Sequence, residues 1–190
     1  MQTVSILIPN YNHALFLQQR IESVLNQTYQ DFELIILDDC STDHSKTIIE
    51  SYRNHPKVSQ IIYNQQNSGS VFKQWRKGIE LAKGEYIWIA ESDDYAAVDF
   101  LQETVEQLQK DHSLGMVFTL TKAINDKGEQ INNTWDAKEN SIKKLESFGN
   151  VINKENAPLF LVSHMIVENA SSVLFRKSQL MAVGILIRRI

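Results

Sequence analysis

Short continuous apolar runs alternate with amphipathic stretches along residues 1–120 of the chain. A continuous apolar run predicts a strand covered on both faces, whereas apolar positions three or four residues apart predict a helix with one buried face. The predicted strands are Val4–Ile8, Phe32–Leu37, Val58–Tyr63, Glu85–Ala90 and Met116–Leu120. This alternation predicts an α/β fold with a mostly parallel sheet flanked by helices on both faces.

Four helices are expected between these strands, each with apolar residues on one side. They are Ala14–Gln27, a second from the capping residues Ser41–Asp43 to Arg53, a third marked by Phe72, Trp75, Ile79 and Ala82, and a fourth marked by Leu101, Val105 and Leu108. Gly84 is expected to end the third helix, because glycine readily takes the left-handed conformation that follows many helices.

The pattern becomes less regular after residue 122. We expect a turn at Asp126–Gly128, a short helix near Ser141–Phe148, a strand at Ser171–Phe175 and a helix at Ser178–Val183. The apolar run Leu159–Val162 fits either a helix or a strand. With no repeat or linker, the chain is predicted to form one domain over residues 1–190.

Composition excludes several classes of function. The 190 residues are 43% apolar, and the net charge is −4 with lysine and arginine scattered, so nucleic acid is not an expected partner. One cysteine, Cys40, and the absence of a leader or a long apolar span predict a cytoplasmic protein. The seven glycines form neither a dinucleotide-binding nor a P-loop motif.

Polar clusters follow three of the predicted strands. The first strand ends at Pro9, Tyr11 and Asn12, the second at Asp38 and Asp39, and the fourth at Glu91, Asp93 and Asp94. Ligands of open parallel sheets bind beyond the carboxyl ends of the strands, so these residues are expected to share a site. Each cluster also has a structural explanation: a loop with a packed tyrosine, helix capping, and a solvated acidic turn.

The chemistry of these residues suits a nucleoside diphosphate and a cation. Tyr11 offers an aromatic face to a base, and Asp39 can accept the imide N–H of uracil. Asp38 and Asp39 point to opposite sides of a strand and are not expected to share a role. Asp93 beside a diphosphate requires Mg²⁺ or Mn²⁺ between them. Trp75 and Trp88 are assigned to the core, and no histidine is predicted to bind metal.

The sequence resembles the family 2 glycosyltransferases, which have the Rossmann-like glycosyltransferase A fold. The segments that carry the resemblance are VSILIPNYNHALFLQQRIESVLNQTYQDFELIILDDCSTD at 4–43, NSGSVFKQWRKGIELAKGEYIWIAESDD at 67–94 and NASSVLFRKSQLMAVG at 169–184. The resemblance implies a nucleotide-sugar donor, a divalent metal and inversion at the sugar carbon. It also implies a nucleotide-sugar-binding half at 1–120 and an incomplete acceptor-side part at 121–190.

The resemblance assigns roles to residues that match the family's motifs. Pro9, Tyr11 and Asp39 match nucleoside-binding positions, Asp93 matches the metal-binding carboxylate, and Asp94 is expected to face the sugar or the acceptor. Asn12, Asp38 and Ser92 are added to the expected donor-binding set.

Three departures from the family pattern stand out. Glu91 occupies a position where the family often has aspartate, and it is expected to keep the charge and join Asp93 at the metal. Many members carry an arginine near Trp75, whose place Lys73 or Arg76 would take at the donor phosphate. The family's general base lies beyond the segment that matches Gly184, and no carboxylate of this chain matches it, which predicts a truncated chain.

The predicted function is transfer of a sugar from a nucleoside-diphosphate sugar, most simply a UDP-sugar, to an acceptor hydroxyl. The acceptor is a glycan, a lipid-linked sugar or a protein, and membrane association is expected only through a missing C-terminal part. Two alternatives remain open: a non-catalytic nucleotide-binding module, and a sugar nucleotidyltransferase. The second of these usually has a glycine-rich N-terminal loop with a basic residue, and Pro9–Asn12 has neither.

Overall fold

The computed structural model describes residues 3–125, 129–131, 142–147, 149–153, 155–157, 159, 167 and 169–182. Strands and helices alternate as far as β5, as the sequence predicts. The elements are β1 (Val4–Asn10), α1 (Ala14–Leu25), β2 (Phe32–Asp38), α2 (Ser45–Ser51), β3 (Val58–Tyr63), α3 (Val71–Leu81), β4 (Tyr86–Ile89), α4 (Phe100–Lys110), β5 (Met116–Phe118), η2 (Ala170–Ser172), β6 (Val173–Arg176) and α6 (Lys177–Ala182).

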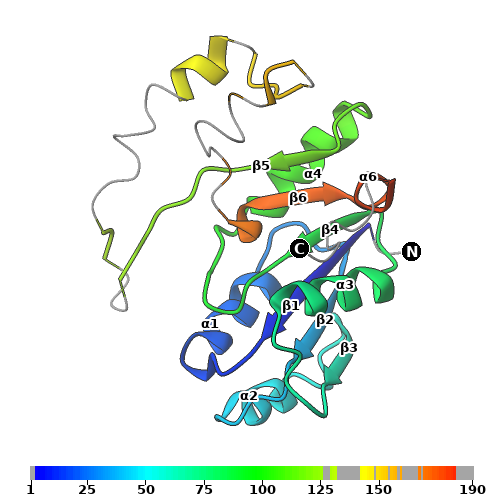
Figure 1. The fold of residues 1–190 in the computed structure, drawn as a ribbon, viewed down its shortest axis with the longest axis vertical. Coiled ribbons are helices and arrows are strands. Elements are labelled where there is room, and N and C mark those ends of the chain that lie inside the picture. The colour runs from blue at the N-terminus through cyan, green and yellow to red at the C-terminus, as the bar shows by residue number, and fades with distance from the viewer. Residues whose placement is uncertain are drawn as a thin grey trace.

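The six strands form one sheet in the order β3-β2-β1-β4-β6-β5 (Figure 1). β1, β2, β3 and β4 are parallel to one another, and β6 runs antiparallel between β4 and β5. The prediction of a mostly parallel sheet flanked by helices is therefore confirmed.

Side chains that alternate along each strand pack against different helices. Ile6 and Ile8 of β1 belong to the core cluster that contains Leu17 and Ile21 of α1, together with residues of α2 and α4. Leu7 packs on the opposite face in a cluster that contains Ile79 of α3. Because successive strand residues point to opposite faces, one apolar run supplies both layers of core.

The sheet opens between β1 and β4 at the ends of these strands. β1 pairs with β2 as far as Asn10 opposite Asp38, whereas its pairing with β4 ends at Leu7 opposite Ile89. Pro9 lies in the stretch of β1 that is not paired with β4. Its missing N–H therefore does not interrupt the hydrogen bonds between these two strands. The strand order also reverses here, since β2 and β3 follow β1 on one side and β4 lies on the other, which marks the ligand crevice of open α/β sheets.

Gly84 does not end the third helix. α3 stops at Leu81, and Ala82 has an extended backbone with φ −61° and ψ 137°. A Cβ on Gly84 would lie 2.6 Å from the backbone nitrogen of Ser5, and the Gly84 N–H donates to the Ser5 hydroxyl at 2.8 Å. Glycine is therefore required at this position by the close approach of two chain segments.

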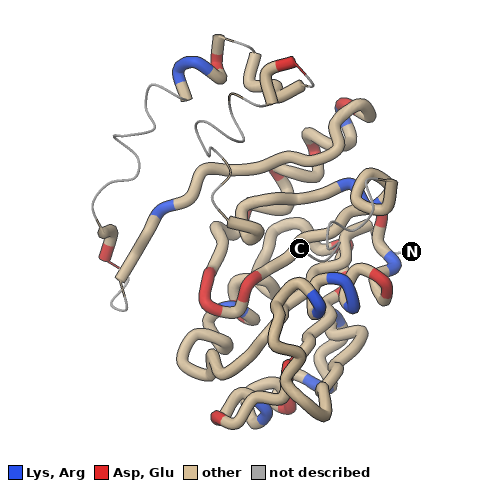
Figure 2. The backbone as a smooth tube through the Cα atoms, in the orientation of Figure 1, with Lys and Arg blue, Asp and Glu red and all other residues tan. Residues whose placement is uncertain are grey.

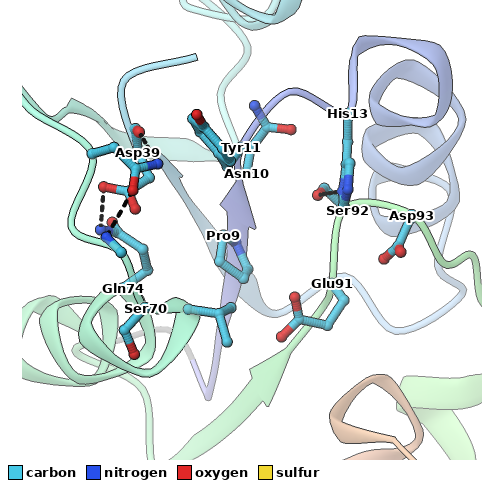
Figure 3. A pocket seen from close by; sticks show the side chains of 13 residues that line it. Pro9, Asn10, Tyr11, His13, Asp39, Ser70, Gln74, Glu91, Ser92 and Asp93 are labelled. Atoms are coloured by element: carbon cyan, nitrogen blue, oxygen red, sulfur yellow. Dashed lines mark hydrogen bonds between the residues drawn. The ribbon is translucent and has the colours of Figure 1, made fainter.

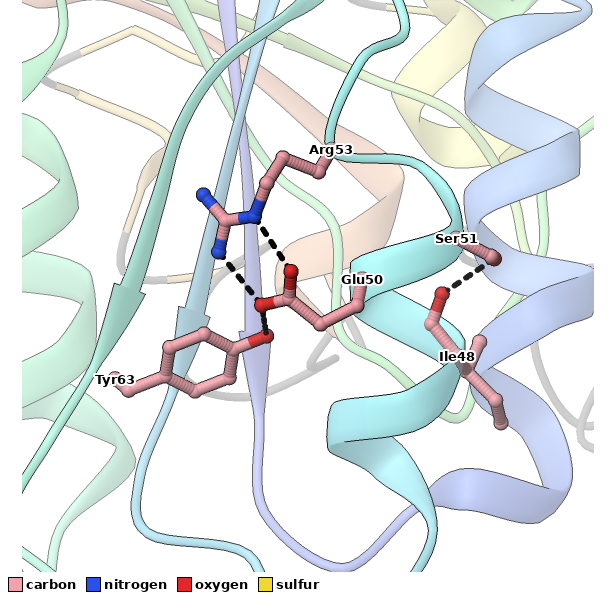
Figure 4. A network of polar contacts seen from close by, with 5 residues as sticks. All are labelled: Ile48, Glu50, Ser51, Arg53 and Tyr63. Carbon is pink, nitrogen blue, oxygen red and sulfur yellow. Dashed lines mark hydrogen bonds and ion pairs between the residues drawn. The ribbon is translucent and has the colours of Figure 1, made fainter.

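The start of α2 also differs from the prediction. The helix begins at Ser45, and Asp43 accepts hydrogen bonds from the N–H groups of Ser45 and Ala14, each at 2.9 Å. At the far end of α2, Glu50 accepts from Arg53 and from the Tyr63 hydroxyl of β3 (Figure 4). These hydrogen bonds, led by that of Arg53, lower the pKa of Glu50 to about 2. The network ties α2 to the edge of the sheet.

The second half of the chain adds a small separate cluster. Residues 142–147 are helical, and Leu145 packs with Phe118 of β5 and with Ile152 and Leu159. The last strand begins at Val173, two residues later than predicted, because residues 170–172 form a 3-10 turn. The predicted turn at 126–128 and the tail at 185–190 lie outside the described residues. Among the described helices, none has the length and hydropathy of a membrane span.

Candidate functional site

A cavity of about 460 Å³, here called the first cavity, lies where β1 and β4 separate. Its walls come from the ends of β1 and β2, the start of α3 and the loop after β4. The lining residues are Pro9, Asn10, Tyr11, His13, Asp39, Asn67, Gly69, Ser70, Val71, Gln74, Glu91, Ser92 and Asp93. The structure therefore brings together six residues that the sequence singled out, namely Pro9, Tyr11, Asp39, Glu91, Ser92 and Asp93.

Asp39 lies at one end of the first cavity, across from Glu91 and Asp93, with Pro9 and Tyr11 between them (Figure 3). Its Oδ1 accepts from Asn64 Nδ2 at 2.6 Å, Gln74 Nε2 at 2.9 Å and the Ser68 N–H at 2.9 Å. Its Oδ2 accepts from the Ser68 hydroxyl at 2.7 Å and from the Ser68 N–H at 3.1 Å. This buried carboxylate thus holds the loop between β3 and α3, and Oδ2 has more acceptor capacity left than Oδ1.

Asp38 and Asn12 do not line the first cavity, although both were expected to bind the donor. Asp38 is 3% exposed and accepts from Asn10 Nδ2 at 2.8 Å and from the Ser41 hydroxyl at 2.6 Å. Asn12 has a positive φ of 56°, and its Oδ1 accepts from the Thr42 N–H at 2.7 Å. Both side chains join the loops after β1 and β2. Asp38 and Asp39 thus have separate hydrogen-bond partners, and only Asp39 lines the first cavity.

Glu91 faces the first cavity and is held by Trp75. Its Oε1 accepts from Trp75 Nε1 at 2.7 Å, so Trp75, which the sequence assigned to the core, supports the site. Burial raises the pKa of Glu91 to about 7, with a smaller contribution from Asp93 and Asp94, while the Trp75 hydrogen bond and the charge of Arg20 oppose the rise. Trp88, by contrast, is fully buried, as predicted.

A second cavity, of about 490 Å³, adjoins the same loop. It is lined by Asp93, Asp94, Tyr95, Ala96, Ala97, Asp99, Phe100, Glu103, Thr119, Leu120, Thr121, Lys122, Ile124, Asn169, Ser171 and Ser172. Asp93 lines both cavities, and Asp94 lines the second one only. The side chain of Asp93 therefore lies at the boundary between the two cavities, where it can contact ligands bound in either one.

The comparison with protein families decides the classification of this chain. A family model described as Glycosyl transferase family 2 matches residues 5–172. The chain belongs to this family. The match includes the ends of β1, β2 and β4 that build the first cavity.

Curated relatives are longer than the matched region. The chain is 37% identical over 145 residues to a chondroitin synthase of Escherichia coli, with 76% of this chain and 21% of the relative covered. It is 36% identical over 143 residues to a hyaluronan synthase of Pasteurella multocida, with 75% of this chain and 14% of the relative covered. The chain thus spans about a fifth or less of these two proteins.

Solved structures show the same fold. Staphylococcus aureus TarS 1–349, solved in complex with UDP-GlcNAc, matches with a TM-score of 0.72 and 23% identity, covering 96% of this chain and 48% of TarS. The mannosyltransferase PcManGT of Pyrobaculum calidifontis, in complex with GDP-Man and Mn²⁺, matches with a TM-score of 0.65 and 18% identity, covering 95% of this chain and 46% of PcManGT. The glycosyltransferase A fold is therefore shown.

The basic residues expected at the donor phosphate lie elsewhere. Lys73 Nζ donates to the Ser68 carbonyl at 2.7 Å, and Arg76 pairs with Glu80 at 2.9 Å on the exposed side of α3. Neither residue lines the first cavity. The structure thus gives no support to a phosphate contact from either side chain in this arrangement.

His13 and Gln74 are lining residues that the sequence reasoning missed. His13 Nδ1 lies 2.7 Å from the Ser92 hydroxyl, which links the start of α1 to the loop after β4. Gln74 Nε2 contacts Asp39, as described above. Both residues lie inside the segments that carry the family resemblance, which was the available signal.

Ser171 supports the loop after β4 from the far side. Its carbonyl accepts from Trp88 Nε1 at 2.9 Å, and its hydroxyl accepts from the Glu91 N–H at 3.0 Å. These two contacts hold the end of β4, from which the loop with the carboxylates begins.

The carboxylates at the first cavity have the donor chemistry of a divalent cation site. Glu91 retains Oε2 beyond its bond to Trp75, and Asp93 is exposed at the cavity. Among the described residues, no group of three or more histidine, cysteine, aspartate or glutamate side chains is arranged to hold a metal. Oxygen donors from few protein residues suit Mg²⁺ or Mn²⁺, which commonly bind one or two carboxylates and substrate phosphates. The residues present fit such an ion.

Proposed function

We propose that this chain carries the donor-binding part of a glycosyltransferase that transfers a sugar from a nucleoside diphosphate, UDP in particular, to an acceptor hydroxyl in polysaccharide biosynthesis. One observation carries the proposal: the crevice at the reversal of strand order places Tyr11, Asp39 and Asp93 around a single cavity. The chondroitin and hyaluronan synthases among the relatives support the assignment to polysaccharide biosynthesis.

The end of the first cavity near Asp39 is the proposed nucleoside site. Tyr11 is 45% exposed and offers its ring to the base, and Asp39 Oδ2 is the oxygen proposed to accept the imide N–H of uracil. The UDP-GlcNAc held by the TarS structure supports uracil as the base. Because Asp39 is already oriented by the loop between β3 and α3, the base would bind without reorganising its acceptor.

The opposite end is the proposed diphosphate and metal site. Asp93, with Glu91 beside it, would hold Mn²⁺ or Mg²⁺, and the Mn²⁺ bound to PcManGT supports this choice. The ion would stabilise negative charge on the leaving diphosphate, an effect worth several kcal/mol in general. Glu91, held by Trp75, would orient the site.

The second cavity is the proposed acceptor site. It meets the first cavity at Asp93, so an acceptor hydroxyl there would approach the sugar from the side opposite to the diphosphate, as inversion requires. Direct displacement also requires a general base. Among the described residues, none after Ile124 adds a carboxylate to this cavity. The base is therefore not assigned.

Calorimetry with UDP and Mn²⁺ tests the donor half. We expect the 190-residue chain to bind UDP in a Mn²⁺-dependent manner, and Asp93→Asn to lose about 10- to 100-fold in affinity, because one ligand of the ion is neutralised. Asp111→Asn, which removes an exposed acid that lines neither cavity, is the matched control. Metal-independent binding, or equal binding by the Asp93 and Asp111 variants, would refute the proposed metal site.

A non-catalytic nucleotide-binding module is the second candidate. The observation that favours it is that the described residues after Ile124 add no carboxylate to the second cavity. Incubation of the chain with UDP-GlcNAc and Mn²⁺, followed by measurement of released UDP, separates the candidates. Slow hydrolysis that Asp93→Asn abolishes indicates an enzyme, whereas tight binding without hydrolysis or transfer indicates a module.

A further inference from the structure

Arg20 is a charged side chain inside the apolar core. It lies on α1 and is 0% exposed, and its Nε, Nη1 and Nη2 atoms have no hydrogen-bond partner in the part of the chain that the structure describes. Its guanidinium carbon lies 5.0 Å from the centroid of the Trp88 ring, which is a cation–π contact. A buried guanidinium without hydrogen bonds is costly, so another interaction must compensate for it.

The compensating charges belong to the loop Glu91–Asp94, here called the acidic loop. The negative charges of Asp94, Glu91 and Asp93 raise the pKa of Arg20 and oppose the effect of its burial. Burial lowers the pKa of Arg20 to about 10, which leaves the side chain protonated at neutral pH. Figure 2 shows the acidic residues after β4 running beside α1.

Arg20 acts on these carboxylates through space. No salt bridge between described residues joins Glu91, Asp93 or Asp94 to a cation, and Arg20 lines neither cavity. It therefore does not touch a ligand in either cavity. Its buried charge is little screened by solvent and lies over the ring of Trp88 in β4, three residues before Glu91.

We propose that Arg20 is a built-in counter-charge that positions the acidic loop and weakens divalent-metal binding until a nucleoside diphosphate is present. The inference rests on the proposed function, because it concerns the same metal site. The guanidinium offsets part of the negative charge that the carboxylates present to a divalent ion. The two diphosphate charges would then raise the affinity for that ion.

Binding of Mn²⁺ alone, followed by the electron paramagnetic resonance of free Mn²⁺ at pH 7.5, tests the proposal. We expect Arg20→Met and Arg20→Gln to bind Mn²⁺ about tenfold more tightly than the native chain, because a nearby positive charge is removed. Arg20→Lys, which keeps the charge, is expected to stay within about threefold of the native affinity. Ile21→Val, which trims the core cluster that contains Trp88 without a change of charge and lines neither cavity, is the matched control and should match the native chain.

The same variants can overturn the proposal. A purely structural role for Arg20 predicts weaker or unchanged Mn²⁺ binding in folded Arg20→Met and Arg20→Gln, and either result contradicts the counter-charge. If Arg20→Lys gains as much Mn²⁺ affinity as Arg20→Met and Arg20→Gln, the charge of Arg20 is not the cause of the tighter binding. Folding of each variant is checked by its thermal unfolding transition.

A double-mutant cycle between Arg20 and Asp94 provides a metal-free test. In the presence of a chelator, we expect Asp94→Asn to lower the unfolding midpoint of the native chain but not that of Arg20→Met, since the pair is coupled. Asp99→Asn should change both backgrounds equally. Equal effects of Asp94→Asn in the two backgrounds would refute the coupling. A chain that binds no Mn²⁺ in any variant would overturn the proposed metal site, and the cycle then still decides whether Arg20 balances the loop.

Discussion

The two ends of the first cavity are built in opposite ways. At one end, the carboxylate of Asp39 is buried and accepts from Asn64, Ser68 and Gln74. At the other end, Glu91 has Trp75 as a partner and Asp93 is exposed. The carboxylate of Asp39 is thus satisfied by hydrogen bonds within the chain. Glu91 and Asp93 place two carboxylates at the opposite end, and no cation of the described residues contacts them. Under the proposed function, this contrast corresponds to a preformed nucleoside end and a phosphate end that a ligand completes.

The largest expected effect comes from breaking the satisfied end. Asp39→Asn replaces one carboxylate oxygen by an NH₂ group, which then faces either the Ser68 donors at Oδ2 or the donors of Asn64, Ser68 and Gln74 at Oδ1. We expect a loss of about 2–4 kcal/mol in the free energy of unfolding, because buried donors lose their partner. Chemical denaturation of the metal-free chain measures this loss.

Asp93→Asn provides the counterpart at the open end. Since Asp93 is exposed, its replacement should leave the free energy of unfolding within about 0.5 kcal/mol of the native value. A stability loss for Asp93→Asn as large as that for Asp39→Asn would contradict the difference between the two ends.

Substitutions at Cys40, the residue after Asp39, test how tightly the backbone is held at the Asp39 end of the first cavity. Its φ is +65°, the left-handed region that disfavours side chains branched at Cβ. We expect Cys40→Val to destabilise the chain by about 1–2 kcal/mol. Cys40→Gly should change stability by less than about 0.5 kcal/mol, because relief of strain is offset by the greater freedom of glycine in the unfolded chain. Thermal unfolding of both variants checks the order, and a Val variant as stable as the Gly variant would contradict it.

Trp75→Phe sharpens the comparison at the open end. The substitution keeps an aromatic ring against Phe72 but removes the N–H that holds Glu91 Oε1. We expect Mn²⁺-dependent UDP affinity to fall about three- to tenfold, because the loss of one hydrogen bond to a charged group leaves Glu91 less well oriented. Phe72→Leu, which alters the ring contact but keeps the Trp75 N–H, is the matched control. Equal affinities for the Trp75 variant and the native chain would exclude a role for this hydrogen bond.

The apolar pattern was sufficient to predict the sheet and the edge at which the site lies. Runs such as Phe32–Leu37 are buried on both faces because helices cover the sheet, so their ends could be located from composition alone. The same argument placed Asp39 and Glu91 near one another without any knowledge of their partners. Strand ends follow from local sequence, and parallel strands place their ends at a common edge.

Side-chain partners could not be predicted in this way. The apolar stripe of α3 assigned Trp75 to the core, and only the folded arrangement shows that its indole N–H reaches Glu91. Asp38 was expected to bind the donor because it is a carboxylate at the end of a strand. In the structure it accepts hydrogen bonds from Asn10 and Ser41 and so connects two loops. Gly84 was assigned to a helix end, whereas the approach of Ser5 is what requires it. Each of these contacts depends on packing between distant segments.

Glu50 gives the smallest expected effect and shows what a satisfied carboxylate contributes in water. Like Asp39 it accepts several hydrogen bonds, but it is exposed, so solvent competes with Arg53 and Tyr63. Its pKa is lowered from 4.5 to about 2, so its contribution to stability is present above pH 4.5 and is lost as the pH falls towards 2. Glu50→Gln should therefore show a shallower loss of stability than the native chain between pH 4.5 and 2, with little difference at pH 7. Thermal unfolding across this range measures it, and parallel profiles for the two proteins would show that the network contributes nothing in solution.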